Sequence, residues 1–251
     1  MVEQEPADPV APLRDELLAT TENLFACLNG RTFDTFAKLT SDAWRGQLFG
    51  SDEPLPADLF ISLAASLPES DYSVIGLNDV IVIDDTTVTA SVTYRSAYQQ
   101  HTGVWRFSRQ TVDGLAAWVL ESEQRLAVST PPGTSTIEVV FEDNGYRVTP
   151  SAVIGSDVVL NLSNPTSDDH EALILRFDSG VGADALLQGA SATLPEGITL
   201  VGQSTVLAGG QGSMYLTGLE PGVYTIVDLF PDENGNPHLS SGMVATFTVL
   251  F

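Results

Sequence analysis

Asp228 is the residue whose position raises the clearest chemical question in this sequence. It lies near the end of an apolar stretch, 222–229, that has the composition of a β-strand. Because side chains alternate along a strand, Tyr224, Ile226 and Asp228 share one face, and the first two indicate that this face is inward. A buried, unpaired carboxylate costs free energy, so Asp228 should be hydrogen-bonded, solvated or bound to a cation.

Three stretches around Asp228 together resemble the cupredoxin family. They are GYRVTPSAVIGSDVVLNLSN (145–164), NPTSDDH (164–170) and GVYTIVDLFPDENGNPHLSSGMVATFTV (222–249). The resemblance extends over roughly 135–251 and implies an all-β, Greek-key sandwich. The short strand patterns of this half, separated by Gly, Pro and Asn, independently favour a β-sandwich.

The resemblance also implies a set of metal ligands, and one of them is changed. His170 and His238 match the two histidine ligands, and Met243 matches the axial methionine. Asp228 stands where the family has its cysteine, and PDENGNP lengthens the segment between Asp228 and His238. Blue copper requires a soft thiolate ligand, so the sequence predicts that this domain does not carry blue copper.

Two interpretations of these residues remain open. In the first, the site has lost its metal and the protein has no cofactor. Asp228 then caps the loop that follows it, and His170 and His238 are polar surface residues. In the second, His170, Asp228 and His238, with Met243 nearby, hold Cu or Zn, because two imidazoles and a carboxylate suit such ions.

The first half of the chain combines helical patterns with strand patterns. Its strands are separated by turn signals, Asp84-Asp85 and Asp113-Gly114. The predicted elements are helices at 12–28, 31–39 and 56–67, followed by strands at 72–83, 88–98, 101–110 and 115–123.

Helices followed by an antiparallel meander resemble the nuclear-transport-factor-like family, which includes ketosteroid isomerase. The final hairpin, VWRFSRQTVDGLAAWVLESEQRL, has Trp105, Gly114 and Trp118 at the places where the family has an aromatic residue, a turn glycine and a tryptophan. The resemblance covers roughly 12–127. It implies an α+β cone, in which helices pack on a curved antiparallel sheet that encloses a ligand pocket in many members.

Aromatic residues are the candidates for lining such a pocket. Even-numbered positions of the strand at 88–98 form its more apolar face, which places Tyr94 and Tyr98 inside the cone or at its mouth. Trp44 could close it. The alternative is that these aromatic side chains simply fill the core.

Catalytic groups are not evident in this half. An isomerase of this kind needs a carboxylate base inside the pocket, and the only substitute that the pattern offers is Asp79. His101 is expected to be exposed. No Ser-His-Asp order, phosphate-binding loop or HExxH motif appears in the sequence, so no catalytic residue is assigned.

The segment VSTPPGTS, at 128–135, has the composition of a linker between the two halves. We therefore expect a flexible acidic tether at 1–11, an α+β domain at 12–127, the linker, and a β-sandwich at 136–251. The tether resembles a segment that follows a removed signal or lipid anchor, which predicts an extracytoplasmic, secreted or envelope-anchored protein. The alternative is that it is simply a frayed terminus.

Composition excludes several classes of partner. The formal net charge is −23, which repels phosphate backbones and argues against nucleic-acid binding. No apolar run approaches the roughly 18 residues needed to span a bilayer. The prediction is a non-catalytic protein that binds a small molecule or another protein. The alternatives are a non-blue metal-binding protein and a small-molecule isomerase or hydrolase using the cone pocket.

Overall fold

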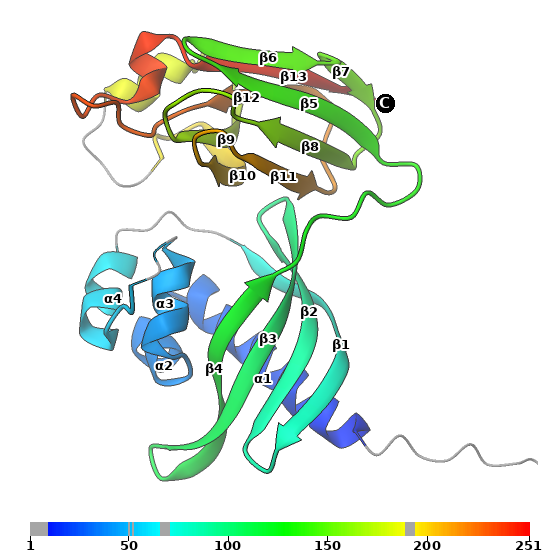
Figure 1. Ribbon diagram of the computed structural model, residues 1–251, viewed down its shortest axis with the longest axis vertical. Helices are drawn as coiled ribbons and strands as arrows, with labels where there is room; N and C mark the ends of the chain where they lie inside the picture. Colours follow the sequence, from blue (N-terminus) through cyan, green and yellow to red (C-terminus); the bar gives the residue numbers. More distant parts are fainter. Residues whose placement is uncertain (1–9, 50, 52, 66–70, 189–193) are drawn as a thin grey trace, which may run out of the picture. The chain divides into compact units, whose positions relative to one another are not determined.

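The computed structural model of the protein describes residues 10–49, 51, 53–65, 71–188 and 194–251 (Figure 1). Its chain divides into two compact units, which are Met1–Arg95 with His101–Leu126, and Ser96–Gln100 with Ala127–Phe251. Nine of the eleven residues expected to form the N-terminal tether lie outside the described residues. No helix among the described residues is both long and apolar enough to cross a membrane.

The helices of the first unit lie in its N-terminal part. Three of them correspond to predicted helices, and the third along the chain, which carries Trp44, was not predicted. Its start is fixed by Ser41, whose hydroxyl accepts a hydrogen bond from the backbone N–H of Trp44 at 3.1 Å, as a helix N-cap does. The helices are α1 (Ala11–Asn29), α2 (Phe33–Lys38), α3 (Asp42–Leu48) and α4 (Ala57–Ala64).

The strands of the first unit pair in sequence order, as the predicted meander requires. At the predicted turn between the last two, Asp113 and Gly114 have φ angles of 51° and 84°, the left-handed conformation that a tight hairpin needs at both positions. The strands are β1 (Tyr72–Asp84), β2 (Thr87–Ser96), β3 (Gln99–Val112) and β4 (Leu115–Arg125).

Helices and strands of the first unit share one hydrophobic core, and α1 packs against β1 (Figure 1). On β2, the even-numbered residues Val88, Ala90, Val92 and Tyr94 are buried, as predicted. Cys27 is also buried in this core. Helix-on-sheet burial therefore positions the aromatic side chains of this unit.

A β-bulge interrupts the pairing of β3 with β4. Arg106 lies opposite Ser122, whereas the next residue, Phe107, lies opposite Leu120, so Glu121 has no partner in the ladder. An extra residue reverses which alternate side chains face the core. Glu123, which strict alternation from Leu120 would turn outward, therefore lies opposite the buried Trp105.

The second unit is a β-sandwich, which confirms that prediction. One sheet has the order β11-β8-β5-β6 and the other the order β10-β9-β12-β13-β7, and one core cluster takes side chains from both (Figure 1). The bounds are β5 (Ser135–Glu142), β6 (Gly145–Thr149), β7 (Ala152–Ile154), β8 (Val158–Ser163), β9 (His170–Phe177), β10 (Ile198–Val206), β11 (Gln211–Leu216), β12 (Gly222–Val227) and β13 (Val244–Leu250), with 3-10 helices η1 (Ala183–Leu187) and η2 (His238–Ser241).

Candidate functional site: a buried His–Asp–His cluster

Two strands of the second sheet and the 3-10 helix η2 bring the candidate ligands together at one end of that sheet. His170 is the first residue of β9, Asp228 follows the last residue of β12, and His238 begins η2, shortly before β13. Strand β12 is antiparallel to both β9 and β13. The start of β9, the end of β12 and the start of β13 therefore lie together, although His170 is 58 residues from Asp228.

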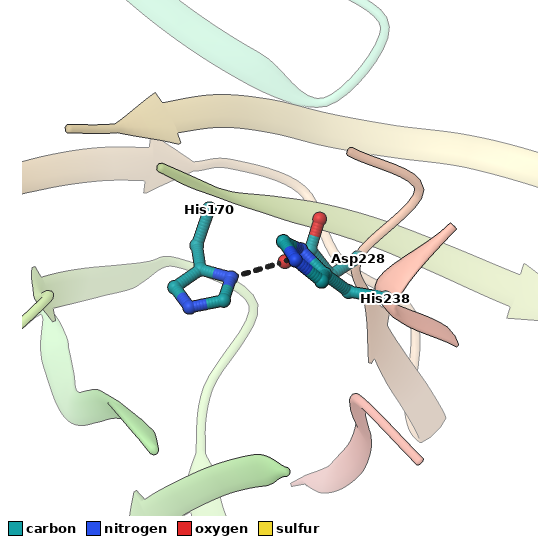
Figure 2. Close-up of side chains that lie close together, drawn as sticks. All are labelled: His170, Asp228 and His238. Carbon is teal, nitrogen blue, oxygen red and sulfur yellow. Dashed lines mark hydrogen bonds and ion pairs between the residues drawn. The ribbon is translucent and has the colours of Figure 1, made fainter. Parts of the chain in front are cut away.

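Both imidazole rings approach one carboxylate oxygen of Asp228, and Figure 2 shows the contact from His170. The Nδ1 atom of His170 lies 2.7 Å from Oδ2 of Asp228, and Nδ1 of His238 lies 3.0 Å from the same oxygen. The centroids of the two rings are 4.6 Å apart. One ligand atom from each residue thus lies within 4.8 Å of the others.

All three side chains are buried, which corrects one of the two sequence interpretations. His170 is 2% exposed, Asp228 0% and His238 9%. The two histidines are therefore not polar surface residues. Burial removes water as a competing partner, so each polar atom must be satisfied by protein or by a bound ion.

Backbone hydrogen bonds hold the loop between β12 and β13. The carbonyl oxygen of Asp228 accepts from Leu239 N at 2.7 Å, and Asp228 N donates to the carbonyl of Met243 at 3.3 Å. Oδ1 of Asp228 accepts from Phe230 N at 2.8 Å, which is the loop-capping contact expected of this residue. One carboxylate oxygen therefore organises the loop, while the other meets the histidines.

Asn164 fixes the loop that leads to His170. Its side-chain amide donates to the carbonyl oxygens of Asp168 at 2.8 Å and Val206 at 2.9 Å, and its Oδ1 accepts from Thr166 N at 3.1 Å. The loop is thereby closed on itself and attached to β10. His170 enters β9 from a fixed direction.

The surroundings of the cluster are apolar and electrostatically coupled to it. Phe141 stacks on His170 with ring centroids 5.5 Å apart. Burial, followed by the charges of Asp228 and Glu171, raises the pKa of Tyr146. Burial, followed by the charge of Asp228, raises the pKa of Glu171 to about 7. Little solvent screens Asp228 from these neighbours.

The geometry of the cluster is compatible with a metal ion. Ligand atoms about 2.0–2.2 Å from a tetrahedral ion are about 3.3–3.6 Å from one another. The two nitrogen–oxygen distances of 2.7 and 3.0 Å would therefore have to lengthen by about 0.3–0.9 Å. Met243 is fully buried in the main hydrophobic core cluster of this unit. The same distances are also those of two hydrogen bonds from imidazole N–H groups to one carboxylate.

The aromatic residues predicted to line a pocket in the first half are only partly brought together. Trp44 and Tyr94 both pack around Trp105, with centroid distances of 6.0 and 5.5 Å. Tyr98 is not with them, because it belongs to the second unit and packs against the core of that unit. The expectation that Tyr98 joins Trp44 and Tyr94 was wrong, because β2 ends at Ser96 and Tyr98 lies in the turn that follows it.

The sequence interpretation missed the buried carboxylate of the first unit. Asp79 is exposed, whereas the side chain of Glu123 is only 5% exposed and accepts a hydrogen bond from the Tyr94 hydroxyl at 3.1 Å. His101, expected in solvent, is half-buried and stacks on Tyr94 at 4.9 Å. The bulge in β4 hid Glu123, because the alternation pattern by itself turns it outward.

Comparison with known proteins gives fold similarities only. No protein-family model matches the chain, and no curated protein matches it. Similar solved structures include dithionite-reduced auracyanin from Roseiflexus castenholzii, at 20% identity, with a TM-score of 0.34 and coverage of 47% of this chain and 100% of that one.

Two further solved structures are similar to part of the chain. Auracyanin A, a "blue" copper protein from Chloroflexus aurantiacus, has 17% identity and a TM-score of 0.34. The match covers 47% of this chain and 100% of the auracyanin A chain. A ketosteroid-isomerase-like protein from Kribbella flavida has 19% identity and a TM-score of 0.30, and covers 47% of this chain and 84% of its own. At such identities, these similarities assign no function to this chain.

Proposed function

We propose that this protein binds a divalent metal ion, Cu²⁺ or Zn²⁺, through His170, Asp228 and His238. The observation that carries the proposal is that Nδ1 atoms of two histidines from different elements approach one oxygen of a fully buried aspartate. Met243 is placed beside the ion as a fourth, weaker neighbour. The bound ion replaces the two imidazole hydrogen bonds that this carboxylate otherwise accepts.

The donor set decides which ions fit. Two imidazoles and a carboxylate are borderline-to-hard ligands, which suit Zn²⁺ and Cu²⁺, whereas Cu⁺ prefers thiolates and thioethers. Without a thiolate, a bound copper ion has no blue-copper electronic structure. The site therefore serves metal binding or structural stabilisation, and rapid electron transfer is not part of the proposed function.

Charge and location are consistent with this role. A net charge of −23 attracts cations from solution. His238 is the least buried of the three and gives the ion a path to the site. We place the protein outside the cytoplasm, as its acidic N-terminal segment predicts, where it acts as a non-catalytic binding protein.

The competing interpretation is a metal-free cluster, in which the two imidazoles simply neutralise Asp228. The test is metal analysis of protein purified without a histidine tag, followed by Zn²⁺ and Cu²⁺ titration of wild type, His170→Ala and His238→Ala. The chain has three histidines, so His101→Gln is a matched control that removes an imidazole from the other unit.

We expect wild type and His101→Gln to bind one ion equally well. His170→Ala and His238→Ala should lose more than about 100-fold in affinity, because even changes that only support a ligand cost 10- to 100-fold. The bound ion should also raise the free energy of unfolding of wild type, by about 2.7 kcal/mol when the ion concentration is 100 times Kd. Equal titrations for wild type and both alanine variants would exclude the proposed site.

A further inference from the structure

Two indole N–H groups of the first unit are buried without a hydrogen-bond acceptor. Trp44 Nε1 and Trp105 Nε1 are the buried side-chain nitrogen or oxygen atoms with no partner in the part of the chain that the structure describes. Trp44 is 3% exposed and Trp105 is 0% exposed. A buried donor without an acceptor costs about 1–3 kcal/mol, so both groups require an acceptor.

Both indoles lie next to the carboxylate of Glu123. Trp105 is directly opposite Glu123 across β3 and β4, and α3, which carries Trp44, packs against β4. Burial raises the pKa of Glu123, while the charge of Arg125 and the nearby donors, Tyr94, Trp105 and Trp44, lower it. The two N–H groups therefore act on the carboxylate, although neither meets the distance and angle of a hydrogen bond with it.

Gly103 makes room for this carboxylate. A Cβ at Gly103 would lie 2.9 Å from Oε1 and 3.0 Å from Cγ of Glu123, which is closer than such atoms approach. Gly103 is opposite Arg125, whose exposed side chain places Nε 3.8 Å from Oε1 of Glu123. The carboxylate is thus buried, with the exposed side chain of Arg125 beside it.

We propose that Glu123, Trp44 and Trp105 together bind one hydroxyl oxygen, belonging either to water or to the hydroxyl end of a small uncharged molecule. A hydroxyl oxygen can donate one hydrogen bond to the carboxylate and accept one from each indole. A carbonyl oxygen accepts but cannot donate, and an anion is repelled by Glu123. The surrounding aromatic rings favour an apolar remainder on any larger ligand.

This site is independent of the metal cluster, since every residue of it belongs to the first unit. It also differs from the pocket expected from sequence, because Glu123 and Trp105 replace Tyr98 among its residues. The binding group is a carboxylate facing two indole donors, rather than an aromatic lining alone.

Indole ¹⁵N–¹H NMR tests the proposal on the full chain. The three tryptophans give three indole signals, and Trp118 is an internal reference because its Nε1 donates to Glu16 at 3.0 Å. One measurement detects cross-relaxation between each indole proton and long-lived water. A second follows the signals during titration with methanol, 2-propanol and cyclohexanol.

We expect the signals of Trp44 and Trp105, but not that of Trp118, to show the bound hydroxyl. Cross-relaxation with water and no saturation by any alcohol identifies the occupant as water, whereas a saturable shift identifies an alcohol hydroxyl. Either result supports the site. Absence of both signatures at Trp44 and Trp105 would overturn it.

Two variants separate binding from folding. Glu123→Leu should remove the water signal and weaken alcohol binding about tenfold or more, because the hydroxyl loses its acceptor. Glu123→Gln retains an acceptor oxygen of the same shape and should keep both signatures in weakened form. If Glu123→Leu does not fold, the test uses Glu123→Gln and a third variant, Trp105→Phe. Unchanged indole signals in Glu123→Gln, together with an unchanged Trp44 signal in Trp105→Phe, would contradict the assignment.

Discussion

Each unit of this protein contains a buried carboxylate, Asp228 or Glu123, and the neighbours of the two carboxylates differ. Asp228 in the second unit faces two imidazole nitrogens, which can either donate a hydrogen bond or ligate a metal. Glu123 in the first unit faces a tyrosine hydroxyl and two indole N–H groups. These groups offer the carboxylate hydrogen bonds only. The same acidic group is therefore suited to a cation in one unit and to a hydroxyl in the other.

The two carboxylates also differ in how they are held. Asp228 is fixed by backbone hydrogen bonds of its own loop, to Leu239 and Met243. Glu123 is directed inward by a bulge in a long hairpin strand and has room because residue 103 is glycine. The first arrangement fixes the ligand atoms closely, whereas in the second the two indole donors do not reach hydrogen-bonding geometry with the carboxylate.

Replacing the carboxylate by a thiolate should break this comparison most visibly. Asp228→Cys puts a soft ligand between His170 and His238, with Met243 nearby, and should give an intensely coloured Cu²⁺ complex of the blue-copper kind. Wild type should bind Cu²⁺ with only weak colour. Visible absorption and electron paramagnetic resonance measure the difference.

Glu123→Cys is the matched control for that change. It introduces a thiol at the other buried carboxylate, where no imidazole pair faces it, and should stay colourless with stoichiometric Cu²⁺. A colourless but copper-loaded Asp228→Cys protein would show that the two histidines do not approach the ion together.

The acid dependence of the first unit provides the next largest effect. Burial, and then Arg125, lower the pKa of His101 from 6.5 to about 3. The folded unit thus favours neutral His101, and this stabilisation is complete above pH 6.5 and is lost as the pH falls towards 3. His101→Phe keeps an aromatic ring against Tyr94. Over that pH range its free energy of unfolding should fall by about 1–2 kcal/mol less than that of wild type.

Urea unfolding followed by tryptophan fluorescence measures this loss. All three tryptophans belong to the first unit, so the signal reports that unit and not the histidines of the metal cluster. Identical pH dependence in wild type and His101→Phe would mean that His101 is protonated normally in the folded protein.

The smallest effect has the opposite sign and concerns Glu123. Its pKa is raised in the folded unit, chiefly by burial, so its contribution to stability is present below the unfolded pKa and is lost as the pH rises through the folded one. Glu123→Gln carries no charge and should therefore be more stable than wild type at pH 7 by about 1 kcal/mol. The same fluorescence assay, repeated at pH 4, should find this advantage gone. An advantage of equal size at pH 4 and pH 7 would contradict an ionisable, buried Glu123.

Sequence periodicity predicted most elements because local patterns specify them. The turn at Asp113-Gly114 and the buried even-numbered face of β2 need only neighbouring residues to be recognised. Helix α3 and strand β7 were missed, since both are short and their apolar patterns contain few repeats. The β-sandwich followed from the density of short strand patterns.

Site residues divide differently between sequence and structure. The resemblance to the cupredoxin family indicated His170, Asp228 and His238 as candidates, but the sequence could not choose between a surface position and a buried cluster. Glu123 was not indicated at all, because a single unpaired residue, Glu121, reverses the alternation before it. Tyr98 was assigned to the wrong group for a related reason, since its strand ends in a different environment.

By itself, the sequence determined the element types, the two-part organisation expected of the chain and the absence of a thiolate ligand, because each depends on residue identity or on neighbours along the chain. The tertiary structure alone decided that His170 meets Asp228 across 58 residues and that Glu123 turns towards two tryptophans. Strand pairing and register, which bring distant residues together, are set by packing of the whole unit and leave no local pattern in the sequence.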